Sequence, residues 1–289
     1  MSEPQSLDRQ ELKAFALPEP GDGDKHEHGR LLIVAGSRTL PGAALLCAHG
    51  AMRAGAGKLQ IATVESVAVA IGVAMPESRS IGLAEAVDGG FAHDAVADIA
   101  ALGADVDAVV AGPGMFESSA CETVAQALLG TEVPLALDAG LLRSLAPQAE
   151  AARRSKTPPV LLPHAGEMAA LLGCARDEVE RDPIACGRAC ADRYGAITLV
   201  KGATSHIVHP DGRTWVYRGG ANGLGVSGSG DTLAGIVGGL LARGADPLTA
   251  LLWSVVLHGE AGEELAREVG PVGFLAREIP DRIPGLLAR

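Results

Sequence analysis

The stretch Val226-Ser-Gly-Ser-Gly-Asp-Thr-Leu-Ala-Gly235 places a glycine-rich turn directly before a long apolar helical pattern. Glycine lets a backbone N–H approach a ligand closely, and the start of a helix leaves several N–H groups without partners. Those groups, together with the positive end of the helix dipole, favour a phosphate or a developing anion. The stretch therefore predicts an anion-binding loop at the start of a helix.

A carboxylate follows this loop, and its presence needs an explanation. Gly228, Ser229 and Gly230 lead directly into Asp231. A carboxylate repels a bound anion, but it can take a proton from a hydroxyl while a phosphoryl group is held opposite. Aspartate before an apolar run also caps helices routinely. On these four residues alone, both interpretations stand.

Outward from this loop, short apolar strands alternate with helical patterns. A hairpin signal at Pro210-Asp-Gly212 lies between strands 205–209 and 213–217. Alternation of this kind predicts a three-layer α/β/α fold, a mostly parallel sheet covered on both faces, with the hairpin as an antiparallel edge. The other predicted strands are 30–35, 59–63, 107–111, 135–139, 160–162 and 196–201, and predicted helices include 42–54 and 66–73.

Unusual residues gather where these strands end. Ligands of open α/β sheets bind at the carboxyl ends of the strands. Each residue also has a simpler explanation, because glycines turn chains and carboxylates cap helices, but their convergence on one edge predicts a site there. The residues are Gly36-Ser37, Gly112-Pro-Gly114, Asp138, Pro163-His164 with Gly166-Glu167, and Lys201-Gly202.

Composition narrows the class of protein. A length of 289 residues and a hydrophobic content of 47% predict one large α/β domain. The net charge of −11 argues against nucleic acid or an anionic membrane as a partner. The sequence has no signal-peptide pattern and no apolar run long enough to span a bilayer, so we expect a cytoplasmic protein. We expect a single catalytic domain at residues 29–289 after a partly flexible lead segment, residues 1–28.

Two common nucleotide motifs are absent. Gly36 and Gly42 lie too far apart for a dinucleotide fingerprint, which argues against hydride transfer. Gly42 is followed by two alanines and not by the Lys-Ser/Thr of a P-loop.

Nine short motifs in this order resemble those of the ADP- or ATP-dependent NAD(P)H-hydrate dehydratases, a family of the ribokinase-like superfamily. The resemblance runs from about Gly29 to Arg267. The motifs are Leu31-Leu-Ile-Val-Ala-Gly-Ser37, Pro41-Gly-Ala-Ala44, Ala51-Met-Arg-Ala-Gly-Ala-Gly57, Met75-Pro-Glu77, Ala111-Gly-Pro-Gly114, Asp138-Ala139, Pro163-His-Ala-Gly-Glu167, Lys201-Gly-Ala203 and Gly228-Ser-Gly-Asp231.

The resemblance implies a ribokinase-like fold and a repair reaction on hydrated NADH or NADPH. ADP or ATP phosphorylates the misplaced ring hydroxyl, and phosphate then leaves with help from the ring nitrogen. Asp231 would take the hydroxyl proton, and the N–H groups of Gly228, Ser229 and Gly230 would hold the phosphoryl group. With Asp231, the residues Ala43, Gly114 and His164 would bind the hydrated nicotinamide. Nucleotide contacts would come from Gly230 and from Lys201, Gly202, Ala203, Thr204 and Ser205.

The resemblance also implies Mg²⁺ without direct protein ligands. Glu77 and Glu167 would position the ion through water, or else cap helices and pack. We further expect a homo-oligomer, with a tetramer as one candidate, and a separate epimerase chain, because residues 1–28 are too few to form one. His164 has a second interpretation as a strand-end residue with satisfied hydrogen bonds.

The sequence departs from the family's usual pattern near the expected pocket, at Gly220-Ala-Asn-Gly-Leu224, Leu162, Ala165 and Leu40. Two alternatives share the anion loop. A kinase of the same fold would leave the phosphoryl group on an alcohol such as a sugar or hydroxyethylthiazole. A non-catalytic nucleotide-binding protein would have no use for the Asp231 carboxylate. The choice between ADP and ATP, and between the NADH and NADPH hydrates, stays open at this point.

Overall fold

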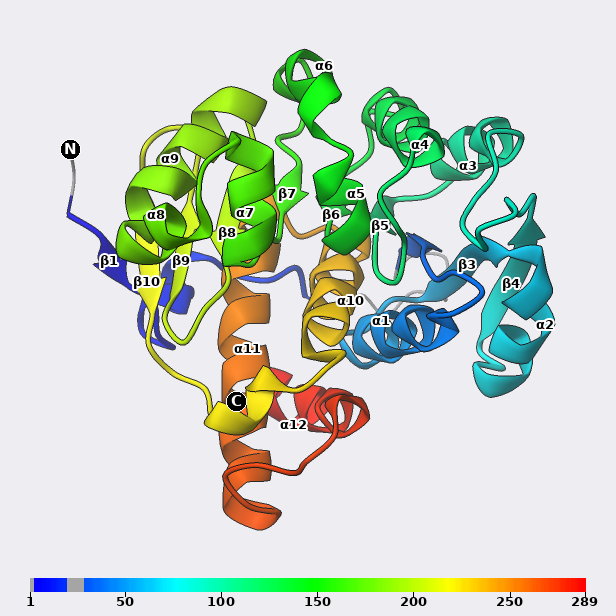
Figure 1. Cartoon of the computed structure of the whole chain (residues 1–289). Coiled ribbons are helices and arrows are strands. Elements are labelled where there is room, and N and C mark those ends of the chain that lie inside the picture. The colour runs from blue at the N-terminus through cyan, green and yellow to red at the C-terminus, as the bar shows by residue number, and fades with distance from the viewer. Residues whose placement is uncertain (1–2, 20–28) are drawn as a thin grey trace.

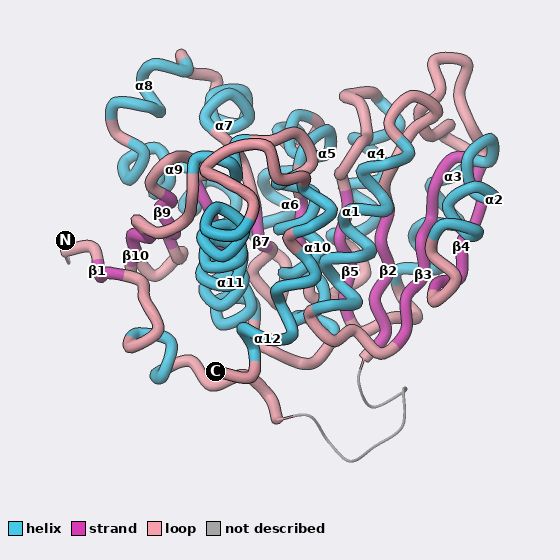
Figure 2. Tube along the Cα trace, turned by 90° about the horizontal axis from the view of Figure 1, so that it is seen from below, coloured by secondary structure: helices cyan, strands magenta, loops and turns pink. Residues whose placement is uncertain are grey.

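The computed structural model describes residues 3–19 and 29–289. Its sheet has ten strands in the order β1-β10-β9-β8-β7-β6-β5-β2-β3-β4, and Figure 2 shows this succession from β1 to β4. The run from β8 to β4 is parallel throughout. The strands are β1 Gln5–Ser6, β2 Arg30–Val34, β3 Lys58–Val64, β4 Ser78–Leu83, β5 Ala108–Ala111, β6 Leu135–Leu137, β7 Val160–Leu161, β8 Ile197–Val200, β9 Ser205–Val208 and β10 Thr214–Tyr217.

Helices cover both faces of the sheet, which confirms the predicted α/β/α layering. The set α3 to α9 lies on one side, and α1, α2, α10, α11 and α12 lie on the other (Figure 1). The helices are α1 Pro41–Arg53, α2 Glu65–Ala74, α3 Ala95–Gly103, α4 Ser119–Leu129, α5 Ala139–Arg143, α6 Ala149–Arg153, α7 Ala165–Leu172, α8 Arg176–Arg181, α9 Pro183–Tyr194, α10 Ser229–Ala242, α11 Pro247–Glu268 and α12 Ile283–Leu287.

The strand β2 shows why its sequence is almost wholly apolar. Leu31 and Ile33 belong to the core on the α1, α10 and α11 side, whereas Leu32 and Val34 belong to the core under α3 to α9. Successive side chains of a strand point to opposite faces, so a strand covered on both sides needs apolar residues at every position. This requirement made the central strands recognisable in the sequence.

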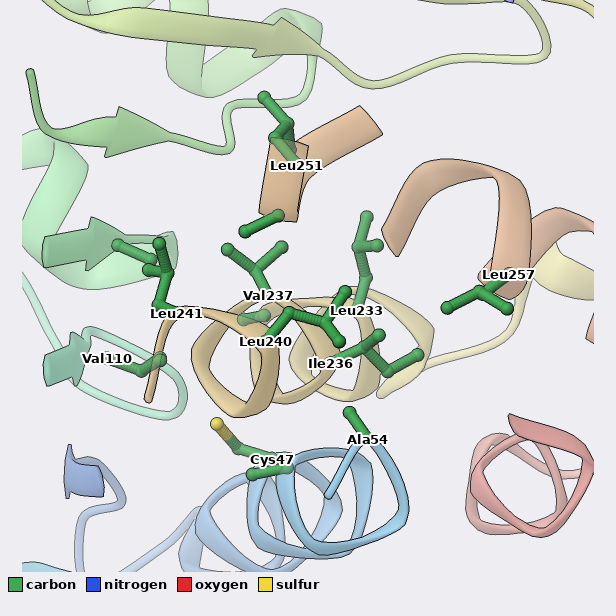
Figure 3. Close-up of a cluster of buried hydrophobic side chains, with 14 of the residues drawn as sticks. Cys47, Ala54, Val110, Leu233, Ile236, Val237, Leu240, Leu241, Leu251 and Leu257 are labelled. Atoms are coloured by element: carbon green, nitrogen blue, oxygen red, sulfur yellow. The ribbon is translucent and has the colours of Figure 1, made fainter. Parts of the chain in front are cut away.

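Two helices meet backbone to backbone next to the segment 228–231, which we call the carboxylate loop. A methyl group added to Gly235 of α10 would lie 2.0 Å from the carbonyl oxygen of Cys47 in α1, and one added to Gly239 would lie 2.5 Å from that of Ala51. Only glycine permits this separation of α1 and α10. Leu233, Ile236 and Leu240 bury further apolar surface of α10 in the same core (Figure 3), so the helix that begins beside Asp231 is fixed in position.

The antiparallel hairpin of β9 and β10 is confirmed. The outermost strand on that side is β1, which pairs parallel to β10 and was not predicted. The strand β4 at the opposite edge was also not predicted, because its alternation of polar and apolar residues is weak. The predicted strand 135–139 ends earlier, at Leu137, and Asp138 occupies the N-cap position of α5 without a side-chain capping hydrogen bond.

The proposed lead segment is described only in part, since residues 1–2 and 20–28 lie outside the described residues; the boundary after residue 28 stays a prediction. Leu7 and Leu12 belong to the core on the α11 side. The Ala- and Leu-rich helix α11 packs largely within the chain. Within the described part of the chain, no helix combines the length and apolar character needed to cross a bilayer.

Candidate active site

A buried ion pair joins the ends of two strands that are not neighbours. Asp138 follows β6 and Lys201 follows β8, with β7 between them. Nζ of Lys201 lies 2.7 Å from Oδ1 of Asp138. Burial works to lower the pKa of Lys201, but the charges of Asp138 and Glu167 outweigh it and hold that pKa above its usual value. The lysine is therefore a permanent cation at this edge.

The glycine loop approaches the same pair. A methyl group placed on Gly230 would lie 3.4 Å from Nζ of Lys201 and 3.8 Å from Oδ2 of Asp138. Asp231 follows on the first turn of α10. Burial raises the pKa of Asp231 to about 7, and the negative charge of Asp138 adds to this effect while Lys201 opposes it. A carboxyl group with such a pKa can accept a proton at neutral pH.

The expected anion-binding N–H groups are not all available. Gly228 precedes α10 with a φ of +90°, a left-handed conformation suited to glycine. The N–H of Ser229 differs from the prediction, because it donates to the carbonyl of Val226 at 3.2 Å. Gly230 and Asp231 belong to the first turn, where N–H groups have no partner within the helix. The N–H groups that remain without a helical partner are therefore those of Gly230 and Asp231, and anion binding by them stays a prediction.

His164 and Glu167 form a capping box at the start of α7. Nδ1 of His164 accepts from the N–H of Gly166 at 3.0 Å, and Oε2 of Glu167 accepts from the N–H of His164, also at 3.0 Å. The capping role predicted as one alternative for Glu167 is therefore present. Nε2 of His164 lies 3.4 Å from Oε1 of Glu167, and the imidazole is 54% exposed. Both ring nitrogens thus lie near partners within the capping box, while about half of the side chain is exposed to solvent.

Ala43 and Gly114 meet at the same carboxyl ends of the strands, near β5 and β2 and away from Lys201 after β8. A methyl group on Gly114 would lie 2.7 Å from Cβ of Ala43, and Gly114 has a φ of +67°. The N–H of Gly36 donates to the carbonyl of Pro113 at 2.8 Å, which ties the two loops together. Two of the four predicted substrate residues, Ala43 and Gly114, thus lie against each other at the carboxyl ends of β2 and β5.

A cavity of about 660 Å³ opens beside Lys201, between the loop after β8 and helix α8. Ser205 is not among its lining residues, whereas its neighbours Thr204 and His206 are. The size suits a nucleoside rather than a single phosphate. Its lining residues include Lys201, Gly202, Ala203 and Thr204 from the loop, His164 and Ala165 from the start of α7, and Arg176, Val179 and Glu180 from α8.

The structure does not bring Glu77 to this site. Glu77 is exposed and precedes β4, whose first residue Ser78 pairs with Leu59 near the start of β3. It therefore lies at the amino ends of the parallel strands, whereas Asp231 and Lys201 lie at the carboxyl-end edge. A role for Glu77 in positioning a metal ion at this site is therefore wrong for the single chain. Among residues 3–19 and 29–289, no group of three or more His, Cys, Asp or Glu side chains is placed to hold a metal ion.

Two contributors were missed or undervalued. Asp138 was noted as a strand-end residue, but its pairing with Lys201 spans 63 positions and left no local signal. His258 on α11 was not singled out at all, yet its Nε2 lies 3.0 Å from Oγ of Ser229. Both contacts depend on how distant segments pack.

Comparison with known proteins settles the family. A family model described as NAD(P)H-hydrate dehydratase matches residues 31–285. The chain belongs to the NAD(P)H-hydrate dehydratase family. It is 48% identical over 279 residues to the ADP-dependent (S)-NAD(P)H-hydrate dehydratase of Xanthomonas campestris, covering 96% of this chain and 94% of that protein. It spans 50% of a bifunctional NAD(P)H-hydrate repair enzyme from Moorella thermoacetica, at 35% identity.

Solved structures agree with this membership. The Bacillus subtilis ADP/ATP-dependent NAD(P)H-hydrate dehydratase, co-crystallised with ATP and Mg²⁺, superposes with a TM-score of 0.84 at 29% identity, covering 100% of this chain and 99% of that chain. A ribokinase-like superfamily protein from Enterococcus faecalis gives a TM-score of 0.83 at 21% identity, covering 98% and 95%. The predicted ribokinase-like fold is confirmed.

The segments that depart from the family's usual pattern take up distinct places. Leu162 is fully buried in the core, so its departure concerns packing. Ala165 lines the cavity beside Lys201. In the segment 220–224, the N–H of Gly220 donates to Oε1 of Glu263 on α11 at 2.9 Å, and Leu224 packs against Gly262. This segment leads into the carboxylate loop and is anchored on α11.

Proposed function

We propose that this chain dehydrates hydrated NADH or NADPH, using ADP or ATP to phosphorylate the ring hydroxyl. The observation that carries the proposal is the position of Asp231, a carboxyl group with a pKa of about 7 on the helix turn whose Gly230 adjoins Lys201. A proton acceptor next to a fixed cation and to unpaired N–H groups is suited to phosphoryl transfer. Membership of the family and the activity named for the Xanthomonas relative support the same reaction.

In the first step, Asp231 accepts the proton of the ring hydroxyl as its oxygen forms a bond to the terminal phosphorus. The bond between that phosphorus and the nucleotide's bridging oxygen breaks, which releases AMP from ADP or ADP from ATP. Lys201 and the N–H groups of Gly230 and Asp231 stabilise charge on the phosphoryl oxygens. In this arrangement Asp231 contacts the ring hydroxyl and not the nucleobase of ADP or ATP.

In the second step, the lone pair of the ring nitrogen forms a double bond to the carbon that carried the hydroxyl. The carbon–oxygen bond breaks, and phosphate leaves with the bonding electrons. Loss of a proton to water from the adjacent ring carbon restores the dihydropyridine. Phosphate departs far more readily than hydroxide, so the nucleotide serves to improve the leaving group.

The shape of the molecule at the carboxyl ends of the strands suggests where the hydrated nicotinamide and the nucleotide bind. The small surface at Ala43 and Gly114 suits a flat nicotinamide ring, with Asp231 as a hydrogen-bonding group and the half-exposed imidazole of His164 as a further contact. The cavity beside Lys201 suits the nucleoside part of the phosphoryl donor, with its phosphates directed toward Gly230. The reacting hydroxyl and phosphorus would then meet near Asp231.

Mg²⁺ would enter with the nucleotide. Mg²⁺ keeps several waters and is often held by phosphates with one or two carboxylates, so the small number of carboxylates here fits an ion carried by the donor. When bound, it neutralises phosphate charge. Glu167 is the carboxylate of this chain that we propose to contact the ion's waters, while its Oε2 remains in the capping box. The proposed homo-oligomeric state and the separate epimerase stay predictions, and light scattering checks the first.

The test is to incubate the protein with hydrated NADPH, Mg²⁺ and either ADP or ATP. Recovery of the dihydropyridine absorbance with release of free phosphate supports the proposal, whereas a stable phosphorylated product supports the kinase alternative. Asp231→Asn should lower kcat by a factor of about 100 to 10,000, as expected for loss of a general base. Nucleotide affinity should stay within a few-fold. Asp98→Asn, on the exposed face of α3, is the matched control, and normal turnover by Asp231→Asn would refute the assignment.

A further inference from the structure

His258 contacts two oxygen atoms of a single residue in the carboxylate loop. It lies on α11, and its Nε2 is 3.0 Å from Oγ and 3.1 Å from the carbonyl oxygen of Ser229. Ser229 is the first residue of α10 and is only 5% exposed. The contact therefore links the long helix α11 to the first turn of α10.

The imidazole is neutral under ordinary conditions, so it does not act as a phosphate-binding cation. Burial lowers the pKa of His258 to about 4, and the nearby charge of Lys201 acts in the same direction. A neutral imidazole has one nitrogen that donates and one that accepts. With hydrogen on Nε2 the ring donates to the Ser229 oxygens, and with hydrogen on Nδ1 it accepts from the Ser229 hydroxyl. Either tautomer holds Ser229.

Ser229 is thereby held by every polar group it has. Its N–H donates to the carbonyl of Val226 at 3.2 Å, and both its oxygens face His258. In the same turn, the hydroxyl of Thr232 lies 3.2 Å from the carbonyl of Gly228 and 3.4 Å from that of Ala276. The first turn of α10 is thus held at its first and fourth residues, Ser229 and Thr232, and Gly230 and Asp231 lie between them in sequence.

We propose that His258 is a positioning residue, which fixes Ser229 and so sets the direction of the Gly230 N–H and the Asp231 carboxylate. The effect on turnover rests on the proposed function, but the effect on loop order does not. A displacement of about 1 Å in a catalytic group costs up to about 100-fold in rate. A residue that acts only through position should lower kcat and leave ligand affinity nearly unchanged.

The experiment is a double-mutant cycle of His258→Ala and Ser229→Ala. His258→Ala should lower kcat by about 10- to 100-fold, with KM for both ligands within about three-fold. Ser229→Ala removes one of the two contacted oxygens and should have a smaller effect. The double variant should resemble His258→Ala, because both changes disrupt one contact. His258→Gln, whose amide can donate to the same oxygens, should recover most of the activity.

The exposed pair His93 and Ser119 is a matched control, since Nε2 and Oγ lie 3.0 Å apart there as well. The His93→Ala and Ser119→Ala variants should keep wild-type kcat. Amide hydrogen exchange over residues 226–233 gives a readout without turnover, and it should be faster in His258→Ala and normal in His258→Gln. If His258→Ala does not fold, Ser229→Ala and His258→Gln carry the test.

The outcomes separate the two proposals. Absence of dehydration by the wild type overturns the proposed function and leaves the exchange prediction standing. Unchanged exchange and kcat in a folded His258→Ala variant overturn the positioning role. Full additivity in the cycle, or a loss in His258→Gln equal to that in His258→Ala, overturns it as well.

Discussion

Lys201 and Asp138 form an ion pair across the end of β7, with side chains that are 18% and 3% exposed. The pair connects the loop beside the cavity to the residue that precedes α5, and the α-carbon of Gly230, which carries no side chain, lies close to both partners. Burying a charge is costly unless its partner is present, so each side chain requires the other. The pair therefore affects stability, donor binding and the charge state of Asp231 together.

Replacing the cation should reveal this coupling. Lys201→Met leaves the Asp138 carboxylate buried without its partner, and we expect a loss of about 3 kcal/mol in the free energy of unfolding. The double variant Lys201→Met/Asp138→Asn should recover most of that loss, because no unpaired charge remains. Chemical denaturation measures both. Lys156→Met, which breaks a pair with Glu132 whose side chains are 73% and 55% exposed, should cost at most about 1 kcal/mol. Equal losses in both lysine variants would contradict the prediction.

Removing the other partner should move the pH profile. Asp138→Asn deletes a negative charge that raises the pKa of Asp231 and frees Lys201 to lower it. A base works when deprotonated, so activity rises with pH through its pKa. The acid limb of kcat/KM should lie near pH 7 in the wild type and at lower pH in Asp138→Asn. An acid limb that stays in place or moves upward would rule out this coupling.

The central strands and the carboxylate loop could be predicted because their signals are local. Strands such as 30–35 are continuous apolar runs, and the glycines before Asp231 are consecutive in sequence. Strand β4, Ser-Arg-Ser-Ile-Gly-Leu, lies at an edge and needs fewer apolar residues, so periodicity did not reveal it. The two-residue strand β1 is too short to leave a pattern.

The site was predicted only as far as its motifs extend. Asp231, Gly230 and Lys201 belong to contiguous motifs, whereas the contact between His258 and Ser229 spans 29 positions and depends on the packing of α11 against α10. The helix-start pattern predicted free N–H groups, but it did not show that the loop itself uses the one on Ser229. Glu77 belongs to a family-like motif, yet strand direction puts it at the opposite edge of the sheet.

Reversing a charge beside the cavity tests whether the nucleotide binds there. Arg176 lines the cavity, whereas Arg181 on the same short helix does not, and both are exposed. Arg176→Glu should weaken ADP and ATP binding by about 3- to 10-fold at low ionic strength, because it repels an anionic ligand, and added salt should reduce the difference. Arg181→Glu makes the same change in net charge and should have little effect. Titration calorimetry at two salt concentrations measures both, and equal weakening by the two variants would place the donor elsewhere.

The Asp231 carboxyl group should also make stability depend on pH. Its pKa of about 7 in the folded chain exceeds the value of about 3.9 in an unfolded chain. The folded state therefore binds the proton more tightly between these values. The contribution of Asp231 protonation to the free energy of unfolding is fully present below about pH 4 and is lost as the pH rises through about 7.

Asp231→Asn removes this titration, so the variant and the wild type should have similar stability at about pH 4, diverge as the pH rises from about 4 to about 7, and differ by a constant amount above that. At pH 8 the variant should be more stable by about 1 to 2 kcal/mol, less than the full pKa shift implies, because the side chain is partly exposed and solvent screens its charge. Asp98→Asn should show no such divergence. Denaturant unfolding at the two pH values measures the difference. An Asp231→Asn chain that is no more stable than the wild type at pH 8 would mean that the carboxylate is adequately solvated or paired, and that its proton affinity is not raised by burial.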